Sequence, residues 1–451
     1  IKNWKLIKFS LVNLRGPAMS FSDKLINSVS SSKIQKPTNI RWRIFFVLFL
    51  LVVVSMIDRA SISIAMPTIA KDLGLSDTMQ GLILSGFFWT YACMQIPGGF
   101  LADKFGARVI LTLSAVLWGI AEALLGLCPT GFALLAANLL LGASEAPVFP
   151  SGARLNAIWL NKNERARGAT LMDAGGPFGA AIGGILVAEM ILYFSSWRIT
   201  FIICGVAAVI LGLIAYWIIR DKPEDSPKVN DGELEIINLD RTENEVVEEN
   251  KEPLLKIIPL RSFTGMLLGR CSWAMCFFGL LTWGPGYLTR ALNLDLKSVG
   301  FATMIIFCAG GCGSLCGGWL ADKLSSKGLG RGRSCKLLLT ISGVCTLFAF
   351  AVLPSIPDVK TSIILLSCAA FVLMWGSMYW TFPPLLAPRS RVATVGGMMN
   401  MAGSVGGICI PLIVGLILDL TGSFDPVLYF FAGCAVIFII MTNIIDLRHV
   451  R

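Results

Sequence analysis

Three ionisable residues lie inside apolar segments that are long enough to cross a membrane. Asp58 and Arg59 lie within the apolar run 44–66, and Glu145 lies within the run 132–159. A charge at the centre of a bilayer costs about 2.5–3.5 kcal/mol on insertion scales, so such residues usually face the interior of a helix bundle and line a pathway. Carboxyl groups in that position can bind and release protons, and a guanidinium can bind a carboxylate through its planar set of donors.

The segments that must position these residues are strongly apolar. Hydrophobic residues make up 55% of the 451 and charged residues 15%, a balance typical of a membrane protein. About 20 apolar residues form a helix that crosses the ~30 Å hydrocarbon layer. On that basis the sequence predicts twelve membrane-spanning helices, at residues 44–66, 80–101, 107–127, 132–159, 168–194, 199–219, 263–289, 298–321, 336–354, 361–386, 393–418 and 426–446.

A long polar segment divides these helices into two groups of six. Twelve of the 28 acidic residues lie between 221 and 257, so we expect a solvated tether with some helix there. The predicted organisation is a cytoplasmic leader 1–43, an N-terminal six-helix bundle 44–219, a cytoplasmic acidic linker 220–262, a C-terminal six-helix bundle 263–446 and a cytoplasmic tail 447–451.

The two halves resemble each other in sequence. GGFLADK at 98–104 recurs as GGWLADK at 317–323, each time after a second span and before a basic turn. Parallel repeats of this kind predict two bundles that rock about a site near the middle of the membrane.

Basic residues favour one orientation in the membrane. Lys and Arg gather in the leader and in the connections near 104–108, 162–167 and 323–336. The positive-inside rule then places both termini in the cytoplasm. The net charge of +10 reflects this bias rather than a surface that binds nucleic acid. The chain opens at Ile1, and we expect residues 1–18 to precede a native start at Met19.

Several kinds of chemistry are excluded or disfavoured. The only histidine is His449, so histidine-based catalysis and histidine metal sites within the bundle are excluded. The GxxxxGK[ST] phosphate-binding motif is absent, which argues against ATP-driven pumping by this chain. Cys308, Cys312 and Cys316 share a helix face without a His or carboxylate, so we expect them to pack helices and not to bind a metal. We expect no enzyme activity, no metal and no cofactor.

A ten-residue motif resembles the signature of the major facilitator superfamily. It runs from Gly99 through Asp103, Lys104 and Gly106 to Arg108. An Asp can cap and charge-pair at a helix end, and basic residues can anchor a turn at lipid headgroups. The resemblance implies twelve transmembrane helices in two pseudo-symmetric bundles, and it implies that these motif residues gate the conformational cycle. A purely topological anchor is equally compatible with the residues alone.

Four shorter strings resemble the anion:cation symporter branch, which includes bacterial proton-coupled carriers of galactonate, glucarate and hexuronates. The strings are Asp58-Arg59-Ala60, Gln95-Ile96-Pro97-Gly98-Gly99, Glu145-Ala146-Pro147-Val148-Phe149-Pro150 and Glu164-Arg165-Ala166. The resemblance implies that Asp58 and Glu145 couple transport to protons and that Arg59 binds substrate; a buried ion pair that only fixes packing is the alternative. The implied further substrate contacts, each also compatible with helix packing, are Tyr91, Ser377, Trp380 and Asn400.

Two positions depart from the pattern of the sugar-acid carriers. Met56 replaces a tyrosine two residues before Asp58, and Gly176 replaces a glutamine in the fifth span. Asp173 adds an acid nearby, so a less hydroxylated acid or a different sugar acid is also compatible. No role is assigned to three further charged residues, of which the last is expected to snorkel to the membrane surface: Glu122, Glu189 and Arg270.

The resulting hypothesis is a monomeric secondary transporter in the inner membrane of a cell. It would move a small organic anion, a sugar acid in class, together with protons into the cytoplasm by alternating access. A uniporter or an exchanger of the same fold is the alternative, because Arg59 would serve all three mechanisms equally well.

Overall fold

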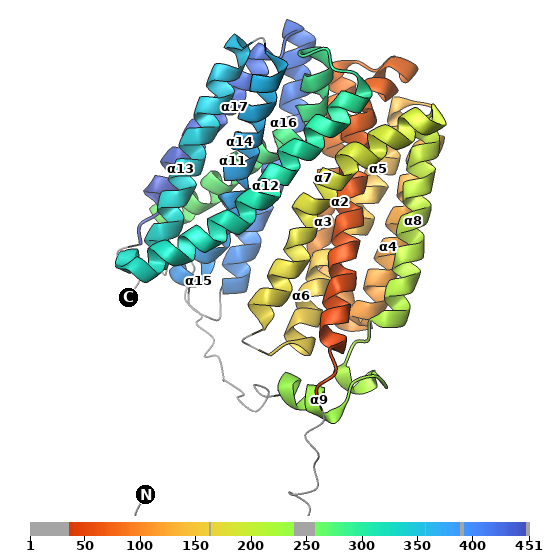
Figure 1. Cartoon of the computed structure of the whole chain (residues 1–451), viewed down its shortest axis with the longest axis vertical. Coiled ribbons are helices and arrows are strands. Elements are labelled where there is room, and N and C mark those ends of the chain that lie inside the picture. The colour runs from red at the N-terminus through yellow and green to blue at the C-terminus, as the bar shows by residue number, and fades with distance from the viewer. Residues whose placement is uncertain (1–35, 162–163, 239–257, 357, 388–391, 448–451) are drawn as a thin grey trace, which may run out of the picture.

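The computed structural model describes residues 36–161, 164–238, 258–356, 358–387 and 392–447. Within these ranges the chain is almost entirely helical, and it contains no strand. The expected start at Met19 and the predicted leader up to residue 35 lie outside the described residues. The helices form two groups that lie side by side, one from each half of the sequence (Figure 1).

The predicted helices agree with the structure to within a few residues at most ends. The N-terminal half consists of α2 (Ile40–Leu73), α3 (Asp77–Phe105), α4 (Ala107–Leu127), α5 (Gly131–Glu145), α6 (Val148–Trp159), α7 (Arg165–Phe194) and α8 (Trp197–Ile218). The C-terminal half consists of α11 (Leu260–Arg290), α12 (Leu296–Leu324), α13 (Arg331–Val352), α14 (Val359–Leu373), the 3₁₀ helix η4 (Met374–Thr381), α15 (Phe382–Leu386), α16 (Val392–Thr421) and α17 (Asp425–Ile444). Shorter elements are η1 (Pro223–Asp225), α9 (Asp231–Asn238), η2 (Ser325–Leu329) and η3 (Leu353–Ser355).

In the described part of the chain, eleven of the predicted spans are long and apolar enough to cross a membrane by themselves. The helix that falls short is α3, although its 29 residues would extend about 43 Å at 1.5 Å per residue. It is more polar because its side chains contact the other half of the molecule: Asp77 and Gln80 bind Arg290, and Gln95 binds Asn400. The predicted all-helical membrane fold is confirmed.

The fourth predicted span is broken at its centre. Glu145 is the last residue of α5, and α6 begins at Val148 after Ala146 and Pro147. Proline cannot donate the backbone hydrogen bond that would continue the helix. The break is packed closely, since a Cβ atom added at Gly98 would lie 2.8 Å from the Pro147 ring. The interruption therefore places the Glu145 carboxyl at a fixed helix end inside the bundle.

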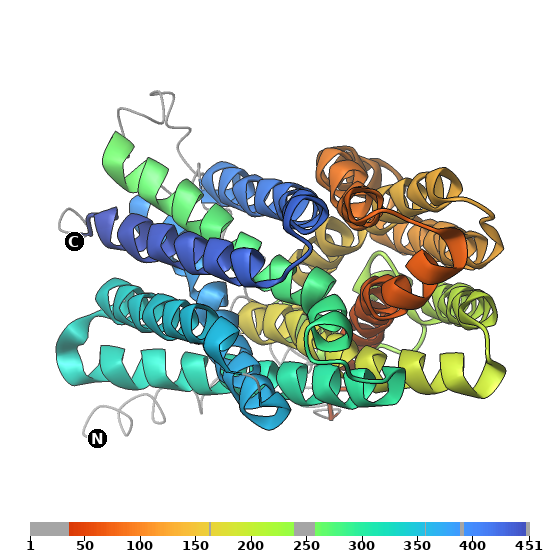
Figure 2. The same ribbon diagram turned by 90° about the horizontal axis from the view of Figure 1, so that it is seen from above.

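The two halves meet through α7 with α12 and through α3 with α16. Seen from above, α7 and α12 lie side by side along the boundary between the two groups (Figure 2). The close approaches lie at the end of the molecule opposite α9. There a Cβ atom added at Gly184 would lie 3.1 Å from the Gly300 carbonyl oxygen, and Gly81 similarly touches the backbone of Pro411. Small residues allow this approach between helices.

The described part of the linker is not a solvated tether. Glu233 of α9 is fully buried, and its carboxylate accepts hydrogen bonds from the backbone N–H groups of Ile40 and Arg41 at 3.1 Å each. Arg41 also forms ion pairs with Glu233 and with Glu164, both at 3.0 Å. This part of the linker therefore binds the beginning of α2. Helix α2 starts at Ile40, which lies inside the segment 1–43 that was predicted as the leader.

The expectation that three cysteines on α12 pack helices together is wrong. Cys308, Cys312 and Cys316 are all exposed on the protein surface.

The beginning of α14 has a side-chain cap. Asp358 accepts hydrogen bonds from the backbone N–H and the hydroxyl of Thr361, and these bonds lower the pKa of Asp358.

Candidate functional site

The strongest polar cluster joins α2 to the end of α5. Arg59 donates from Nε and Nη2 to Glu145 Oε2 at 3.0 and 2.8 Å, and Ser55 Oγ donates to the same oxygen at 2.8 Å. The second carboxylate oxygen, Oε1, is buried and has no hydrogen-bond partner among the described residues. All three donors therefore converge on one oxygen of Glu145, and the other oxygen stays available for a proton or a water.

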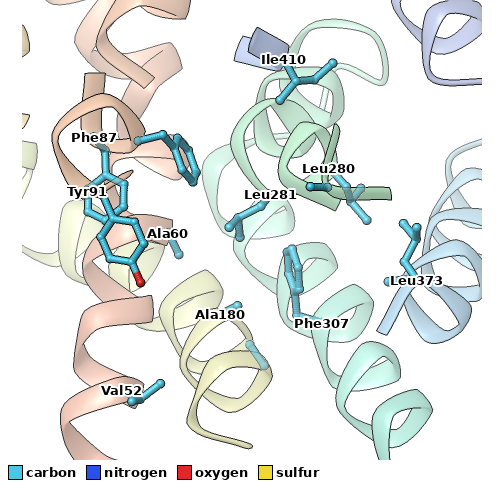
Figure 3. Packing of buried hydrophobic residues seen from close by; sticks show 14 of the residues in the cluster. Val52, Ala60, Phe87, Tyr91, Ala180, Leu280, Leu281, Phe307, Leu373 and Ile410 are labelled. Carbon is cyan, nitrogen blue, oxygen red and sulfur yellow. The ribbon is translucent and has the colours of Figure 1, made fainter. Parts of the chain in front are cut away.

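Two aromatic rings of α3 cover the Arg59 guanidinium. Its Cζ atom lies 4.4 Å from the centre of the Phe87 ring and 4.7 Å from the centre of the Tyr91 ring. The two rings stack with centres 5.2 Å apart, and Figure 3 shows them on one side of α3. Cation–π contacts stabilise a desolvated guanidinium in addition to its ion pair. Of the predicted residues, Arg59, Glu145 and Tyr91 thus form one cluster.

Asp58 lies in a different cluster, between α2 and α4. It is fully buried, as is Glu122, and neither oxygen of the Asp58 carboxyl has a hydrogen-bond partner among the described residues. The Trp118 indole N–H faces this carboxyl without meeting hydrogen-bond geometry. Ser61 Oγ bonds both the Asp58 carbonyl oxygen, at 2.7 Å, and Glu122 Oε1, at 2.8 Å. A buried carboxyl without a cation partner is stable in its neutral form, so the carboxyl groups of this cluster can hold protons.

Helix geometry explains why the side chains of the adjacent residues Asp58 and Arg59 belong to different clusters. Successive residues of an α-helix are about 100° apart around its axis, so these side chains cannot enter the same cluster easily. Ser55 lies one turn before Arg59 and shares its face, which is why both reach Glu145. The spacing of Ser55 and Arg59 was a usable signal in the sequence, whereas the pairing of Asp58 with Glu122 was not.

The residues predicted in the C-terminal half lie on η4 and α16. Asn400 Nδ2 donates to Gln95 Oε1 of α3 at 3.1 Å, which joins the two halves. The Trp380 side chain packs beside Gly396 and is 45% exposed. Ser377 is exposed, and its hydroxyl donates to the Met374 carbonyl oxygen at 3.3 Å. Figure 3 shows that apolar residues of α11 and α12, among them Leu281 and Phe307, face the Tyr91 side of the N-terminal half.

Arg270 was missed by the sequence analysis, which expected it to snorkel. It lies ten residues into α11, about 15 Å along the helix axis, and it is only partly exposed. Its Nη1 donates to the Gly376 carbonyl oxygen at 3.2 Å, and its Cζ lies 4.1 Å from the centre of the Trp273 ring. Asp173 of α7 is the acid that interacts with it electrostatically, without forming an ion pair. The depth of Arg270 within its span was the signal that it faces the interior.

Two other acids have simple surroundings. Glu189, near the end of α7, lies 3.4 Å from Lys297 Nζ, and both side chains are about half-exposed. Asp173 is exposed to solvent even though protein atoms surround it. Within the described residues, no group of three or more His, Cys, Asp or Glu side chains could hold a metal ion.

The residues of the predicted gating motif connect the end of α3 to its own half. Asp103 pairs with Arg154 of α6 at 2.6 Å. Gly106 has a φ angle of +90°, and a Cβ atom there would collide with the Asp221 carboxylate. That carboxylate accepts from the Arg108 backbone N–H at 3.0 Å. Two further motif positions have looser surroundings: the Lys104 ammonium lies 5.3 Å from the Phe105 ring, and Gly99 approaches Pro150.

A polar network closes the two halves at the opposite end. Asp419 of α16 accepts from the backbone N–H groups of Asp77 and Thr78, at 2.9 and 2.8 Å, and so caps α3 from the other half. Arg290 of α11 forms an ion pair with Asp77 and donates to Gln80 Oε1 at 2.7 Å. These contacts close the two halves against each other at this end. The contacts of Asp103 and Arg108 in the gating motif, by contrast, are with residues of the N-terminal half.

Comparison with known proteins agrees with this architecture. The family model for the Major Facilitator Superfamily matches residues 48–411. The chain belongs to the major facilitator superfamily. It is accordingly a multi-pass membrane transporter and not an enzyme.

Three curated relatives span most of the chain. The probable galactarate/D-glucarate transporter GudP of Bacillus subtilis is 29% identical, over 89% of this chain and 90% of its own length. The probable sulfoacetate transporter SauU of Cupriavidus necator is 30% identical, over 85% and 89%. The D-galactonate transporter of Escherichia coli O6:H1 is 30% identical, over 89% and 94%. The chain therefore resembles superfamily members named as transporters of organic acids.

The fold of this superfamily transporter also matches a solved structure. A bacterial homolog of the human lysosomal transporter Spinster, in an inward-facing and occupied conformation, superimposes with a TM-score of 0.70 at 17% identity. The match covers 90% of this chain and 96% of the other. At that identity the likeness concerns the fold alone.

Proposed function

We propose that this transporter carries a small organic anion, a sugar acid in class, into the cytoplasm by proton-coupled symport. The observation that carries the proposal is the buried arrangement of Arg59, Glu145 and Tyr91. A guanidinium that faces aromatic rings and is held by a single carboxylate oxygen can exchange that partner for a substrate carboxylate. The names of the three relatives described above, which are a galactarate/D-glucarate, a sulfoacetate and a D-galactonate transporter, support the same class of substrate.

Protonation of Glu145 is the proposed coupling step. While Glu145 is ionised, its charge satisfies Arg59, and a substrate anion would have to compete with it. When Glu145 takes up a proton, it loses most of its attraction for the guanidinium, and Arg59 becomes free to bind the substrate. The buried pair Asp58 and Glu122 provides a second place for protons in the same bundle.

In the proposed cycle, protons and substrate enter from outside and leave to the cytoplasm. Tyr91, Ser377, Trp380 and Asn400 would contact the substrate: the hydroxyls and the amide can hydrogen-bond it, and the indole ring can stack on it. The bundles would then rock between a state closed by the Asp419 and Arg290 network and a state closed at the other end, where Gly99, Asp103, Lys104, Gly106 and Arg108 would act as the gate.

Uptake into proteoliposomes tests the proposal. The purified chain would be reconstituted and given labelled galactarate or galactonate with an imposed pH gradient, acidic outside. We expect accumulation against the substrate gradient for the wild type and loss of that accumulation for Glu145→Gln, with Glu189→Gln as the matched control because Glu189 is exposed near a helix end. Full uphill accumulation by Glu145→Gln would show that the coupling role is wrong.

An exchanger or a uniporter is the second candidate, because Arg59 would bind the anion in each case. Counterflow separates the three mechanisms. Symport requires the proton gradient, exchange requires substrate on the far side, and uniport requires neither. We expect uptake to depend on the gradient and to continue when no substrate is present inside the liposomes.

The remaining parts of the proposal concern its place in the cell. We propose that the protein functions as a monomer in the inner membrane, with both termini in the cytoplasm. The even number of spans puts the beginning of α2 and the end of α17 at one end of the molecule, where α9 also lies (Figure 1). The basic connections support a cytoplasmic location for that end.

A further inference from the structure

We propose that Arg270 is a second anion-binding residue and that the substrate is a dianionic organic acid, held by Arg59 at one end and by Arg270 at the other. This inference rests on the proposed function and specifies its substrate class. It follows from three properties of Arg270: its unused donors, its level in the membrane and the open space beside it.

The first property is that Arg270 lies well inside its span and forms no ion pair with any other described residue. Its Nη1 makes one hydrogen bond, at 3.2 Å, and its buried Nε has no partner among the described residues. By contrast, the buried guanidiniums of Arg41 and Arg59 each pair with a carboxylate at 3.0 Å or less. Arg270 is only partly exposed and its closest stabilising groups are the Gly376 carbonyl oxygen and the Trp273 ring, so its charge is incompletely compensated. An anion that arrives from solution would complete its coordination.

The second property is that Arg270 lies at the level of the Arg59 cluster. Ser85 Oγ of α3 donates to the Ile408 carbonyl oxygen of α16 at 2.7 Å, which sets the register of these antiparallel helices. Tyr91 follows Ser85 by six residues, about 9 Å along the axis, and Gly403 precedes Ile408 by five residues, about 7.5 Å. Tyr91 and Gly403 are therefore nearly level with each other on opposite halves.

Arg59 lies next to Tyr91, and Arg270 lies next to Gly403. The Arg59 Cζ atom is 4.7 Å from the centre of the Tyr91 ring. On the other half, a Cβ atom added at Gly403 would lie 3.3 Å from Arg270 Nε. The two guanidiniums therefore lie at about the same level in opposite halves of the molecule. A short molecule with an anionic group at each end suits that arrangement better than a molecule with one.

The third property is open space near Asp173, the acidic residue that interacts with Arg270. Asp173 interacts electrostatically with Arg270 from α7 but forms no ion pair with it. Gly176 lies three residues further on and therefore on the same face of α7. A Cβ atom added at Gly176 would meet no atom within 4 Å. There is therefore open space on α7 about one turn from Asp173, and a carboxylate or sulfonate that competes with Asp173 for the guanidinium can occupy it.

Matched acids with one or two anionic groups test this inference. Dissociation constants would be measured on the purified full-length protein for galactarate against galactonate, and for sulfoacetate against acetate. The members of each pair differ mainly in the second anionic group. We expect the dianion to bind at least tenfold more tightly than its monoanion in whichever pair binds, because charge-assisted hydrogen bonds are worth about ten- to hundredfold in affinity.

Substitution of Arg270 should remove that preference. Arg270→Gln should weaken dianion binding about ten- to hundredfold and monoanion binding far less, and Arg270→Lys should fall between Gln and wild type because it keeps the charge without the planar donors. Asp173→Asn should increase the preference, since it removes the competing carboxylate. Arg261→Gln, at an exposed position on the same helix, should leave both affinities unchanged.

The outcomes separate this inference from the proposed function. If the wild type binds galactonate but binds galactarate no more tightly, the dianion inference is overturned and the function stands. Equal loss of mono- and dianion binding in Arg270→Gln, or an unchanged preference in Asp173→Asn, also overturns it. Should none of the four acids bind the wild-type protein, both the inference and the proposed function fail.

Discussion

The two halves of this transporter repeat one fold but differ in what they bury. The buried charged side chains within the described residues all belong to the N-terminal half or to α9, and they are Arg41, Asp58, Arg59, Glu122, Glu145 and Glu233. The buried polar side chains of the C-terminal half, over the same described ranges, are serines and threonines only. Within the described residues, the buried carboxyl groups therefore lie on one side of the boundary.

The same hydrogen bond occurs at equivalent positions of the two halves, so that residues of one half can be matched to residues of the other. Ser114 Oγ of α4 donates to the carbonyl oxygen 30 residues later, and Ser342 Oγ of α13 does the same. Counting eight residues on from each serine leads to Glu122 in the first half and to Phe350 in the second. Both side chains are almost completely buried. The repeat thus kept its packing while a titratable group in one copy corresponds to an aromatic ring in the other.

The difference suggests a division of labour. The N-terminal half offers carboxyl oxygens that lack hydrogen-bond partners, on Asp58, Glu122 and Glu145, where protons can bind. The C-terminal half offers partly exposed groups such as Trp380 and Arg270, which can contact a substrate without changing charge. Substitutions in the N-terminal half should therefore affect coupling to protons, whereas substitutions in the C-terminal half should affect substrate binding.

The largest effect is expected at Arg59. Arg59→Gln should reduce uptake by more than about a hundredfold, because the substrate carboxylate loses its bidentate donor and the buried Glu145 loses its partner. The measurement is initial uptake into proteoliposomes, with Arg198→Gln as control since Arg198 is a partly exposed residue near a helix end. Uptake above a tenth of the wild-type rate would contradict a substrate role for Arg59.

The next largest effect should distinguish coupling from binding. Asp58→Asn should reduce accumulation driven by a pH gradient at least about tenfold, since the amide cannot bind the transported proton, while substrate exchange at equal pH continues. Thr346→Val on α13, at a buried position four residues before Phe350, should change neither. If Asp58→Asn accumulates substrate normally, the proton sites of the N-terminal half do not drive transport.

A smaller effect is expected at the network that closes the halves opposite α9. Asp419→Asn should shift the population toward the state open at that end by about five- to tenfold, which corresponds to about 1 kcal/mol. Distances between spin labels placed on the ends of α3 and α16 would measure the shift. The comparison is Asp358→Asn, which removes a cap within one half only. An unchanged distance distribution for Asp419→Asn would mean that this network does not control opening.

The smallest effect on transport is expected at α9. Glu233→Gln should lower the free energy of unfolding by about 2–4 kcal/mol. Each carboxylate oxygen of Glu233 accepts two hydrogen bonds, and the amide nitrogen of glutamine cannot accept the pair that falls to it, while Arg41 keeps its ion pair with Glu164. Thermal unfolding should show the loss as a drop of a few degrees, and uptake by the folded protein should stay within twofold. A large loss of uptake at unchanged stability would assign α9 a role in the transport cycle.

The sequence by itself determined the helices and identified the residues that needed an explanation. Apolar runs of membrane length and the intramembrane charges Asp58, Arg59 and Glu145 follow from the energy of burial, which depends on local composition. The break after Glu145 was likewise visible as a proline, although its consequence for a helix end was not. Arg270 was judged by its type and its place near one end of a span, and this led to the wrong expectation.

Only the tertiary structure decided which charges meet. Asp58 and Arg59 are neighbours in sequence, yet one faces Glu122 and the other pairs with Glu145. Arg270 and Arg59 are more than 200 residues apart, yet they reach the same level through the register of α3 and α16. Such pairings depend on the rotation and the offset of packed helices, and these are set by contacts along whole helices rather than by any local pattern of residues.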